Sequence, residues 1–207
     1  MLRIGPTPYY RTVSASLFAA MRAAWAEVRP RFEAYQLVLP GSPGFVCQPQ
    51  ACTAYCCHAY SVNLGDADVG RFRRLEQLEL ADFLECDEDG KPLTLPMAQP
   101  FLLRREEGRC KFLGGHLGCT VYEGRPNACR LYPHFIVFWD GEAGRARTTP
   151  SKRAAASFDA AVLGNTYGFI PLLLGHVQCP GFTGDPVNEA EWHRLFSATY
   201  QLQYAAV

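Results

Sequence analysis

The residues with the clearest chemistry are the cysteines, and eight of the nine form a pattern. Two clusters are followed by one cysteine in a CPG turn: Cys47, Cys52, Cys56 and Cys57, then Cys110, Cys119 and Cys129, then Cys179. Cys86 stands outside this pattern and is expected to be a buried structural cysteine. No convincing secretory signal is recognisable, so we expect a cytoplasmic chain whose thiols stay reduced. Clustered reduced thiols predict a metal site.

The cysteine spacing does not fit the common metal motifs. A radical-SAM loop, C-x3-C-x2-C, fits Cys52 and Cys56 but would need a third cysteine where Ala59 stands. A plant-type ferredoxin loop, C-x4-C-x2-C, fails where Tyr55 stands. A zinc ribbon usually pairs ligands two to four residues apart, whereas the second cluster has much wider gaps. Neither zinc nor an iron-sulfur cluster is excluded, since thiolates bind both.

Composition excludes several other classes of protein. Twenty basic residues balance twenty acidic ones, without a long basic stripe, so no nucleic-acid partner is expected. The longest apolar run has about seven residues, against roughly 20 needed to cross a bilayer, so no membrane span is expected. No phosphate-binding loop, dinucleotide-binding glycine pattern or nucleophile elbow is present.

Four segments together resemble the YkgJ-type cysteine-cluster family, which is named for a CxxCxxCC motif and described as zinc- or iron-chelating. They are FVCQPQACTAYCC from Phe45, VNLGDADVGRF from Val62, CKFLGGHLGCTVYEGRPNACRLYP from Cys110, and CPGFTGD from Cys179. The third segment is the most specific. The first departs from the family pattern, because C-x2-C-x2-CC is stretched here to C-x4-C-x3-CC.

The resemblance implies a ligand set and a preferred cofactor. The metal ligands carried over are Cys47, Cys52, Cys56, Cys57, Cys110, Cys119, Cys129 and Cys179, and the preferred cofactor is an iron-sulfur cluster, with zinc as the alternative. The stretched spacing places Cys47 further along the chain from Cys56 and Cys57 than the family pattern does. Because Cys56 and Cys57 are adjacent, one of them could serve a second metal, so that the eight thiolates fill either two four-ligand sites or one site with spare sulfurs. His58 and His116 are candidates to replace a thiolate.

Four thiolates around one zinc ion leave a net negative charge that is costly to bury without compensation. Arg125 and Arg130 flank Cys129, and a helical turn beginning at Pro126 has free amides. We expect these groups to stabilise the thiolate of Cys129 and to lower its pKa. The alternative is that both arginines are solvated.

The remaining pattern predicts a small α+β domain in which short strands and helices surround the metal site, flanked by N- and C-terminal helices. Apolar residues at helical spacing predict the N-terminal helix, with Ser14 as its cap: Val13, Leu17, Met21, Ala24 and Val28. The capping pair Asn188 and Glu191 predicts the C-terminal helix. We divide the chain into an N-terminal helical extension, 1–38, and a cysteine-cluster domain, 39–207.

Between the terminal helices, Gly, Pro and Cys predict a loop over 39–59. Helices are expected from Asp66 or Asp68 through Leu75, over Glu79–Glu85, and over Ala154–Leu163. Short strands are expected on either side of Glu107-Gly108 and of Asp140-Gly141, with another at Thr120–Tyr122, and Asp89-Gly90 is expected to form a turn.

Three classes of function follow. The first is a metal-binding protein with a redox or metal-handling role, whose partner would be a protein redox partner or protein substrate. The second is an enzyme, because CKFL followed by two further cysteines resembles the cysteine region of flagellin lysine N-methylases, which are thought to use an iron-sulfur cluster and S-adenosylmethionine. The third is a disulfide-stapled interaction domain, which the odd number of cysteines disfavours.

Overall fold

A computed structural model describes residues 8–96, 99–147 and 169–204 and confirms the α+β class. The chain forms two compact units. Unit 1 comprises Met1–Ser42, His134–Val177 and Val187–Phe196, and unit 2 comprises Pro43–Pro133, Gln178–Pro186 and Ser197–Val207. These units use other boundaries than the division into 1–38 and 39–207, which stays a proposal.

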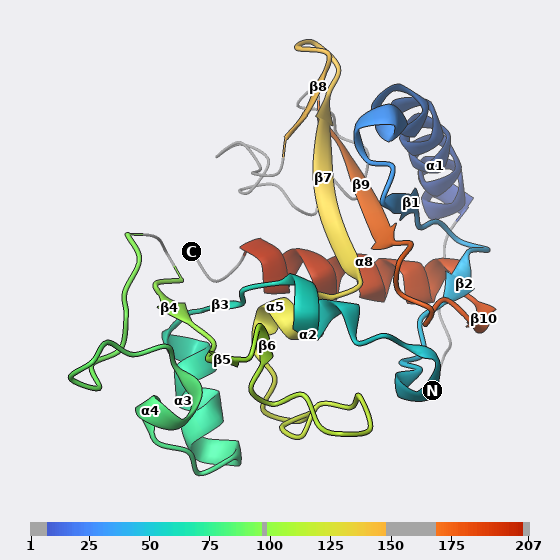
Figure 1. The fold of residues 1–207 in the computed structure, drawn as a ribbon. Helices are drawn as coiled ribbons and strands as arrows, with labels where there is room; N and C mark the ends of the chain where they lie inside the picture. Colours follow the sequence, from blue (N-terminus) through green and yellow to red (C-terminus); the bar gives the residue numbers. More distant parts are fainter. Residues whose placement is uncertain (1–7, 97–98, 148–168, 205–207) are drawn as a thin grey trace, which may run out of the picture. The chain divides into compact units, whose positions relative to one another are not determined.

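Unit 1 is built on an antiparallel sheet. Its strands lie in the order β1 (Tyr35–Leu37), β9 (Phe169–His176), β7 (His134–Asp140) and β8 (Arg145–Arg147) (Figure 1). The two central strands are long and consist mostly of buried residues, which explains their continuous apolar runs. The expected hairpin at Asp140-Gly141 is confirmed, and the Asp140 carboxylate accepts a hydrogen bond from the Ala143 amide at 3.0 Å.

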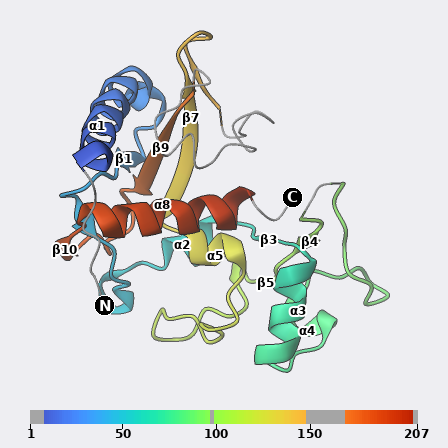
Figure 2. The ribbon, with the colours of Figure 1, turned by 180° about the vertical axis from the view of Figure 1, so that it is seen from behind.

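Helix α1 (Pro8–Val28) packs beside this sheet and contacts β9 (Figures 1 and 2). The helical spacing is confirmed where side chains are described, since Leu17, Met21, Ala24 and Val28 are all buried. Ser14 is not the cap, because the helix begins earlier at Pro8, whose fixed φ suits a first helical turn. A 3₁₀ turn, Arg29–Arg31, follows.

The C-terminal helix α8 (Glu189–Tyr204) begins at the predicted capping box. The Asn188 side chain accepts from the Glu191 amide, and the Glu191 carboxylate accepts from the Asn188 amide, both at 2.9 Å. Within unit 1, Trp192 is fully buried, and its indole nitrogen donates to the carbonyl oxygen of Val38 at 2.7 Å.

Unit 2 contains short elements joined by turns. Three two-stranded pairs are present: β2 (Pro43–Gly44) with β10 (Gly184–Pro186), β3 (Asn63–Leu64) with β4 (Phe101–Leu102), and β5 (Arg105–Glu106) with β6 (Arg109–Cys110). Its helices are α2 (Tyr55–Ala59), α3 (Asp66–Leu75), α4 (Leu80–Phe83) and α5 (Asn127–Leu131), with a 3₁₀ turn at Pro49–Ala51.

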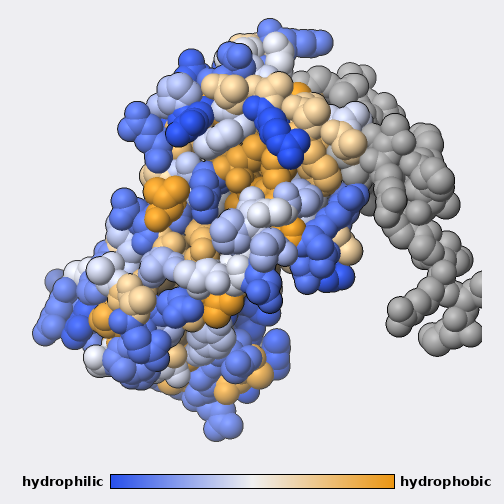
Figure 3. All heavy atoms as spheres, turned by 90° about the vertical axis from the view of Figure 1, so that its right-hand side faces the viewer, coloured by the Kyte–Doolittle hydropathy of each residue, from blue (hydrophilic) through white to orange (hydrophobic). Residues whose placement is uncertain are grey.

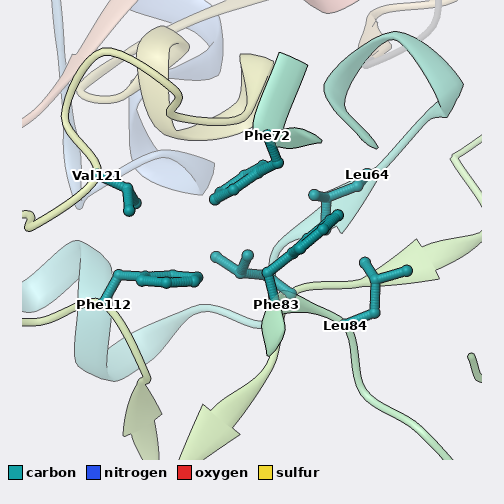
Figure 4. Packing of buried hydrophobic residues seen from close by; sticks show 7 residues of the cluster. Leu64, Phe72, Phe83, Leu84, Phe112 and Val121 are labelled. Atoms are coloured by element: carbon teal, nitrogen blue, oxygen red, sulfur yellow. The ribbon is translucent and has the colours of Figure 1, made fainter. Parts of the chain in front are cut away.

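Aromatic packing holds unit 2 together. Phe72 of α3 stacks on Phe83 of α4 with ring centroids 4.7 Å apart, and Phe112 lies 5.5 Å from Phe72 (Figure 4). Leu64, Leu84, Leu103 and Val121 complete this buried cluster, against which Cys86, Cys110 and Cys119 pack. The apolar core therefore supports part of the cysteine pattern directly.

Several local expectations were wrong in detail. The 39–59 segment is not only loop, because it contains α2, and Thr120–Tyr122 is a turn rather than a strand. The helix expected over Glu79–Glu85 ends at Phe83, and Leu75 is exposed at the end of α3. The turns at Asp89-Gly90 and Glu107-Gly108 are confirmed, with φ of 77° at both glycines. The predicted helix Ala154–Leu163 lies outside the described residues.

In the part of the chain that the structure describes, none of the helices is both long and apolar enough to cross a bilayer. On the face shown in Figure 3, hydrophilic and hydrophobic residues are interspersed.

Candidate metal centre

Seven of the eight patterned cysteines line one cavity within unit 2. Its volume is about 340 Å³, and its cysteines come from the first cluster, from β6, from the turn after it and from α5: Cys47, Cys52, Cys56, Cys57, Cys110, Cys119 and Cys129. Cys86 is not among the lining residues, since it packs on the aromatic cluster with its sulfur 3.6 Å from the Leu84 carbonyl oxygen. All nine cysteines are free thiols.

The donor set suits a thiophilic metal, but the sulfurs surround the cavity without converging on one point. Among residues 8–96, 99–147 and 169–204, no three His, Cys, Asp or Glu side chains are close enough together to hold an ion as they stand. A thiol-lined cavity fits zinc or an iron-sulfur cluster in its chemistry. Binding would therefore draw the cysteine segments toward the bound group.

The first cluster is shaped by a reversal of the chain before α2. Ala54 has a φ of 52°, in the left-handed region, and its amide donates to the sulfur of Cys52 at 3.3 Å. The chain then enters α2 at Tyr55, so Cys56 and Cys57 are consecutive helical residues, with their sulfurs 3.9 Å apart.

Cys57 contacts two neighbouring thiols. Hydrogen bonding between Cys57 and Cys56, with 3.9 Å between the sulfurs, and between Cys57 and Cys110 lowers the pKa of each of those two thiols to about 7. The same two contacts raise the pKa of Cys57 above its usual range. Without metal, therefore, Cys56 and Cys110 are the thiols that ionise most readily in this group.

Arg105, at the start of the β5–β6 hairpin, joins the hairpin to α2. Its guanidinium donates to the carbonyl oxygen of His58 at 2.8 Å and also to those of Tyr60 and Gly108. It thereby satisfies carbonyls at the C-terminal end of α2 and holds Cys57 against Cys110. Its positive charge also contributes to the low pKa of Cys110, after the hydrogen bond from Cys57 and the Phe112 amide. Sequence analysis gave this residue no role.

A buried carboxylate fixes the helix that carries Cys129. Asp68, which is 2% exposed, accepts from the Asn127 amide at the start of α5 at 2.9 Å and forms an ion pair with Arg71. Arg71 in turn donates to the Asn127 side-chain oxygen at 2.9 and 3.0 Å. The sequence suggested Asp68 only as a possible helix cap, and in the structure its carboxylate also anchors α5.

Arg125 behaves partly as expected. It lines the cavity and lies 3.4 Å from the Tyr122 ring centroid, and its positive charge partly offsets the burial that raises the pKa of Cys47, Cys119 and Cys129. Burial outweighs this effect, however, and raises the pKa of Cys129 to about 12, so the expected lowering was wrong for the metal-free chain.

Arg130 and the free amides at the start of α5 were the other groups expected to stabilise the Cys129 thiolate. The Arg130 side chain is exposed, and among the described residues no ion pair or hydrogen bond of its guanidinium is found. The Asn127 amide, one of the free amides expected to face the sulfur, is bound by Asp68 instead.

The candidate histidines differ in their position relative to the cavity. His116 lines the cavity, whereas His58 is not among the lining residues. His134 is buried in β7 of unit 1, and burial lowers its pKa to about 4. His116 therefore stays a candidate ligand.

Cys179 does not line the cavity, but the chain brings it close to the first cluster. Strand β10 pairs with β2, the Val46 backbone amide donates to the Gly181 carbonyl at 2.7 Å, and the Gln48 side-chain nitrogen Nε2 donates to the Thr183 hydroxyl at 3.2 Å. The pKa of Cys179 is raised, first by burial and then by the charges of three thiols: Cys52, Cys56 and Cys47. The expected return of Cys179 to the first cluster is thus seen as proximity.

Comparison with known proteins gave one match. Residues 46–155, more than half of the chain, match the family model "CxxCxxCC: Putative zinc- or iron-chelating domain". This range includes the seven cavity cysteines and ends before Cys179. No curated protein and no solved structure matches the chain. The match supports metal binding in general, and the chain belongs to the CxxCxxCC family of zinc- or iron-chelating domains.

Proposed function

We propose that unit 2 holds an iron-sulfur cluster, or alternatively zinc, through its eight patterned cysteines, and that the protein serves redox chemistry or metal handling in the cytoplasm. The observation that carries the proposal is the cavity itself. Seven thiols from residues 47–57 and 110–129 line this one cavity, although more than fifty residues separate the two groups, and Cys179 lies near three of them. Metal ligation accounts for this gathering better than core packing would, because the thiols face a cavity.

Two features favour a cluster over one zinc ion. The cavity, at about 340 Å³, is roughly ten times the liquid volume of one water molecule. A single zinc ion requires four ligands at about 2.3 Å from one centre, whereas the thiols surround the cavity without converging. A polynuclear cluster needs less movement of the chain.

The chain's own residues would hold the group and offset its charge. Cysteine thiolates supply the ligands, while the guanidinium groups of Arg105 and Arg125 provide positive charge beside them. A bound iron-sulfur cluster would supply one-electron chemistry. The partner would then be a protein that exchanges electrons or metal with this chain, or a protein substrate.

Metal analysis after anaerobic purification tests the proposal. We expect iron and acid-labile sulfide, together with the broad visible absorption of a cluster. Colourless protein with stoichiometric zinc would overturn the preference for iron, and protein that binds neither metal under reducing conditions would overturn the proposed function.

Substitution of the ligands gives a second test. Cys119→Ser and Cys129→Ser should each lose bound metal, because removal of one thiolate leaves a buried site incomplete. Cys86→Ser is the matched control, since Cys86 packs on the aromatic cluster and should retain full metal content. Equal metal content in all three variants would contradict the assignment.

The enzyme alternative depends on a methyl donor. Calorimetric titration of the metal-loaded protein with S-adenosylmethionine should show no binding if the chain is only a metal-binding module. Saturable binding would move the proposal toward the methylase-like enzyme.

A further inference from the structure

We propose that the eight thiols form two neighbouring four-thiolate metal sites rather than one, and this division rests on the proposed function. Site A comprises Cys57, Cys110, Cys119 and Cys129, and site B comprises Cys47, Cys52, Cys56 and Cys179. The division follows from the separate frameworks that position the two sets within unit 2 and from the geometry of α2, where the sets meet.

Site A is supported by the aromatic core and the α3 network. Cys110 and Cys119 pack against the cluster of Phe72, Phe83 and Phe112. The bridge between Leu113 and Cys119 closes the turn that joins them. Cys129 is fixed through α5, whose first amide is held by Asp68.

Site B is supported by a different framework, the β2–β10 strand pair. This pairing and the Val46–Gly181 hydrogen bond bring the segments of Cys47 and Cys179 together, although they are far apart in sequence. The ring of Phe45 lies 6.1 Å from that of Phe182 and packs the same two segments. Cys52 follows on the chain and is held by the Ala54 amide.

Helix α2 divides the adjacent cysteines between the two sets. Consecutive helical residues project about 100° apart, so Cys56 and Cys57 leave α2 in different directions. Cys57 contacts Cys110, a site A residue, through the S–H hydrogen bond. Cys56 lies next to Cys57, with 3.9 Å between the sulfurs, and is an electrostatic neighbour of both sets: Cys47 and Cys179 in site B, and Cys110, Cys119 and Cys129 in site A. We place it in site B because Cys57 already contacts Cys110 and each site then has four thiols.

Apart from Cys56, the electrostatic neighbours of the thiols fall into the same two sets. Cys52 is a neighbour of Cys47 and Cys179, whereas Cys110 is a neighbour of Cys119 and Cys129. Arg125 is a neighbour of both sets, through Cys47 on one side and Cys119 and Cys129 on the other. One guanidinium thus offsets negative charge from two adjacent sites, which four thiolates apiece would make strongly anionic.

Counting metal equivalents tests the division. The reduced, metal-free full chain is titrated with Co²⁺, followed by its thiolate charge-transfer absorption, and then with Zn²⁺ as competitor. We expect two equivalents for the unaltered chain. The double variants Cys47→Ser/Cys179→Ser and Cys119→Ser/Cys129→Ser should each bind one equivalent, and the quadruple variant should bind none.

The outcomes separate the two proposals. Saturation of the unaltered chain at one equivalent would overturn the two-site division while leaving metal binding intact, and this result does not depend on how any variant folds. Loss of all metal from either double variant that keeps the helical circular dichroism of the unaltered chain would also overturn it. Failure of the unaltered chain to bind any metal would overturn the proposed function as well.

Discussion

Arg105 is a residue whose effect on the metal centre can be isolated. Its guanidinium joins α2 to the β5–β6 hairpin through three backbone carbonyls, so it positions Cys57 against Cys110 without being a ligand. We predict that Arg105→Ala weakens metal binding by about 10–100-fold, the range typical of residues that support ligands. Competition with a chromophoric chelator measures the change.

The matched control for Arg105 is Arg130→Ala, which removes an exposed arginine beside Cys129. Its affinity should equal that of the unaltered chain. Arg105→Lys should fall between the two, since an ammonium group cannot reproduce the planar fork that contacts several carbonyls. Equal affinities in all four proteins would contradict a positioning role.

We predict that Asp68 contributes strongly to the free energy of unfolding. Asp68→Asn removes the negative charge that faces the mostly buried Arg71 side chain, which is 15% exposed, and weakens the hold on the Asn127 amide. The free energy of unfolding should fall by about 3 kcal/mol, because a buried charge loses its partner.

Urea denaturation of the metal-free protein measures this change. Asp66→Asn, an exposed carboxylate at the start of the same helix, is the control and should change stability little. Similar losses in the two variants would show that the buried network contributes no more than surface charge.

These residues mark the limit of what the sequence could reveal. The cysteines stand out because their type and spacing are unusual, and Cys86, which lies outside the pattern, packs partly buried against the aromatic cluster. Arg105 gives no such signal, since two of its three partners are carbonyl oxygens 45 and 47 residues away, and every residue has a backbone carbonyl. Arg125 was found only because it is adjacent in sequence to the Cys129 segment.

Among the secondary-structure elements, the β2–β10 pair is the most sensitive to a small change. A Cβ on Gly44 would lie 2.8 Å from the backbone oxygen of Asp185, so Gly44→Ala must push the two strands apart. We predict a stability loss of about 1–3 kcal/mol. The distance between the Cys47 and Cys179 segments should increase, so this variant should bind less metal.

Gly115→Ala is the control within the same unit, because its added Cβ would meet no atom within 4 Å. Thermal unfolding and metal content measured on both variants give the comparison. Equal loss of metal from the Gly115 variant would contradict this prediction, because the loss could then not be attributed to separation of β2 from β10.

The elements predicted well are those with a repeating apolar pattern. Helices α1 and α8 bury one stripe, so their periodicity was visible in the sequence. Helix α2 was missed because five residues span little more than one turn, too short for a period to appear. The strand expected at Thr120–Tyr122 fails because this segment is drawn into a turn after the Leu113–Cys119 bridge.

At the scale of the whole molecule, the metal-free protein should lose stability in alkaline solution. Burial first, and then neighbouring thiolates, raise the pKa of Cys129 to about 12, against about 8.5 for an unfolded cysteine. The folded chain therefore holds this proton more tightly than the unfolded chain does. The resulting stability is complete below about pH 8.5 and is lost as the pH rises toward 12.

The lowered pKa values of Cys56 and Cys110 change the stability in the opposite direction, and they do so at lower pH. Their pKa values of about 7 give stability that is present above about pH 8.5 and lost as the pH falls through 7. Urea denaturation at pH 8.5 and at pH 10.5 is the measurement. Cys129→Ala should show a weaker pH dependence than the unaltered chain, and identical dependence would refute the assignment to this thiol.

The chain completes unit 2 only after it has passed through much of unit 1, which has a consequence for biogenesis. On the ribosome, the cysteines of site A and three of those of site B emerge before β7 and β9 are made, while Cys179 emerges after both. A nascent chain could therefore begin to acquire metal at site A before site B has its fourth ligand. The order of synthesis would then set the order of maturation, and a chain truncated after β7 would carry one half of the centre.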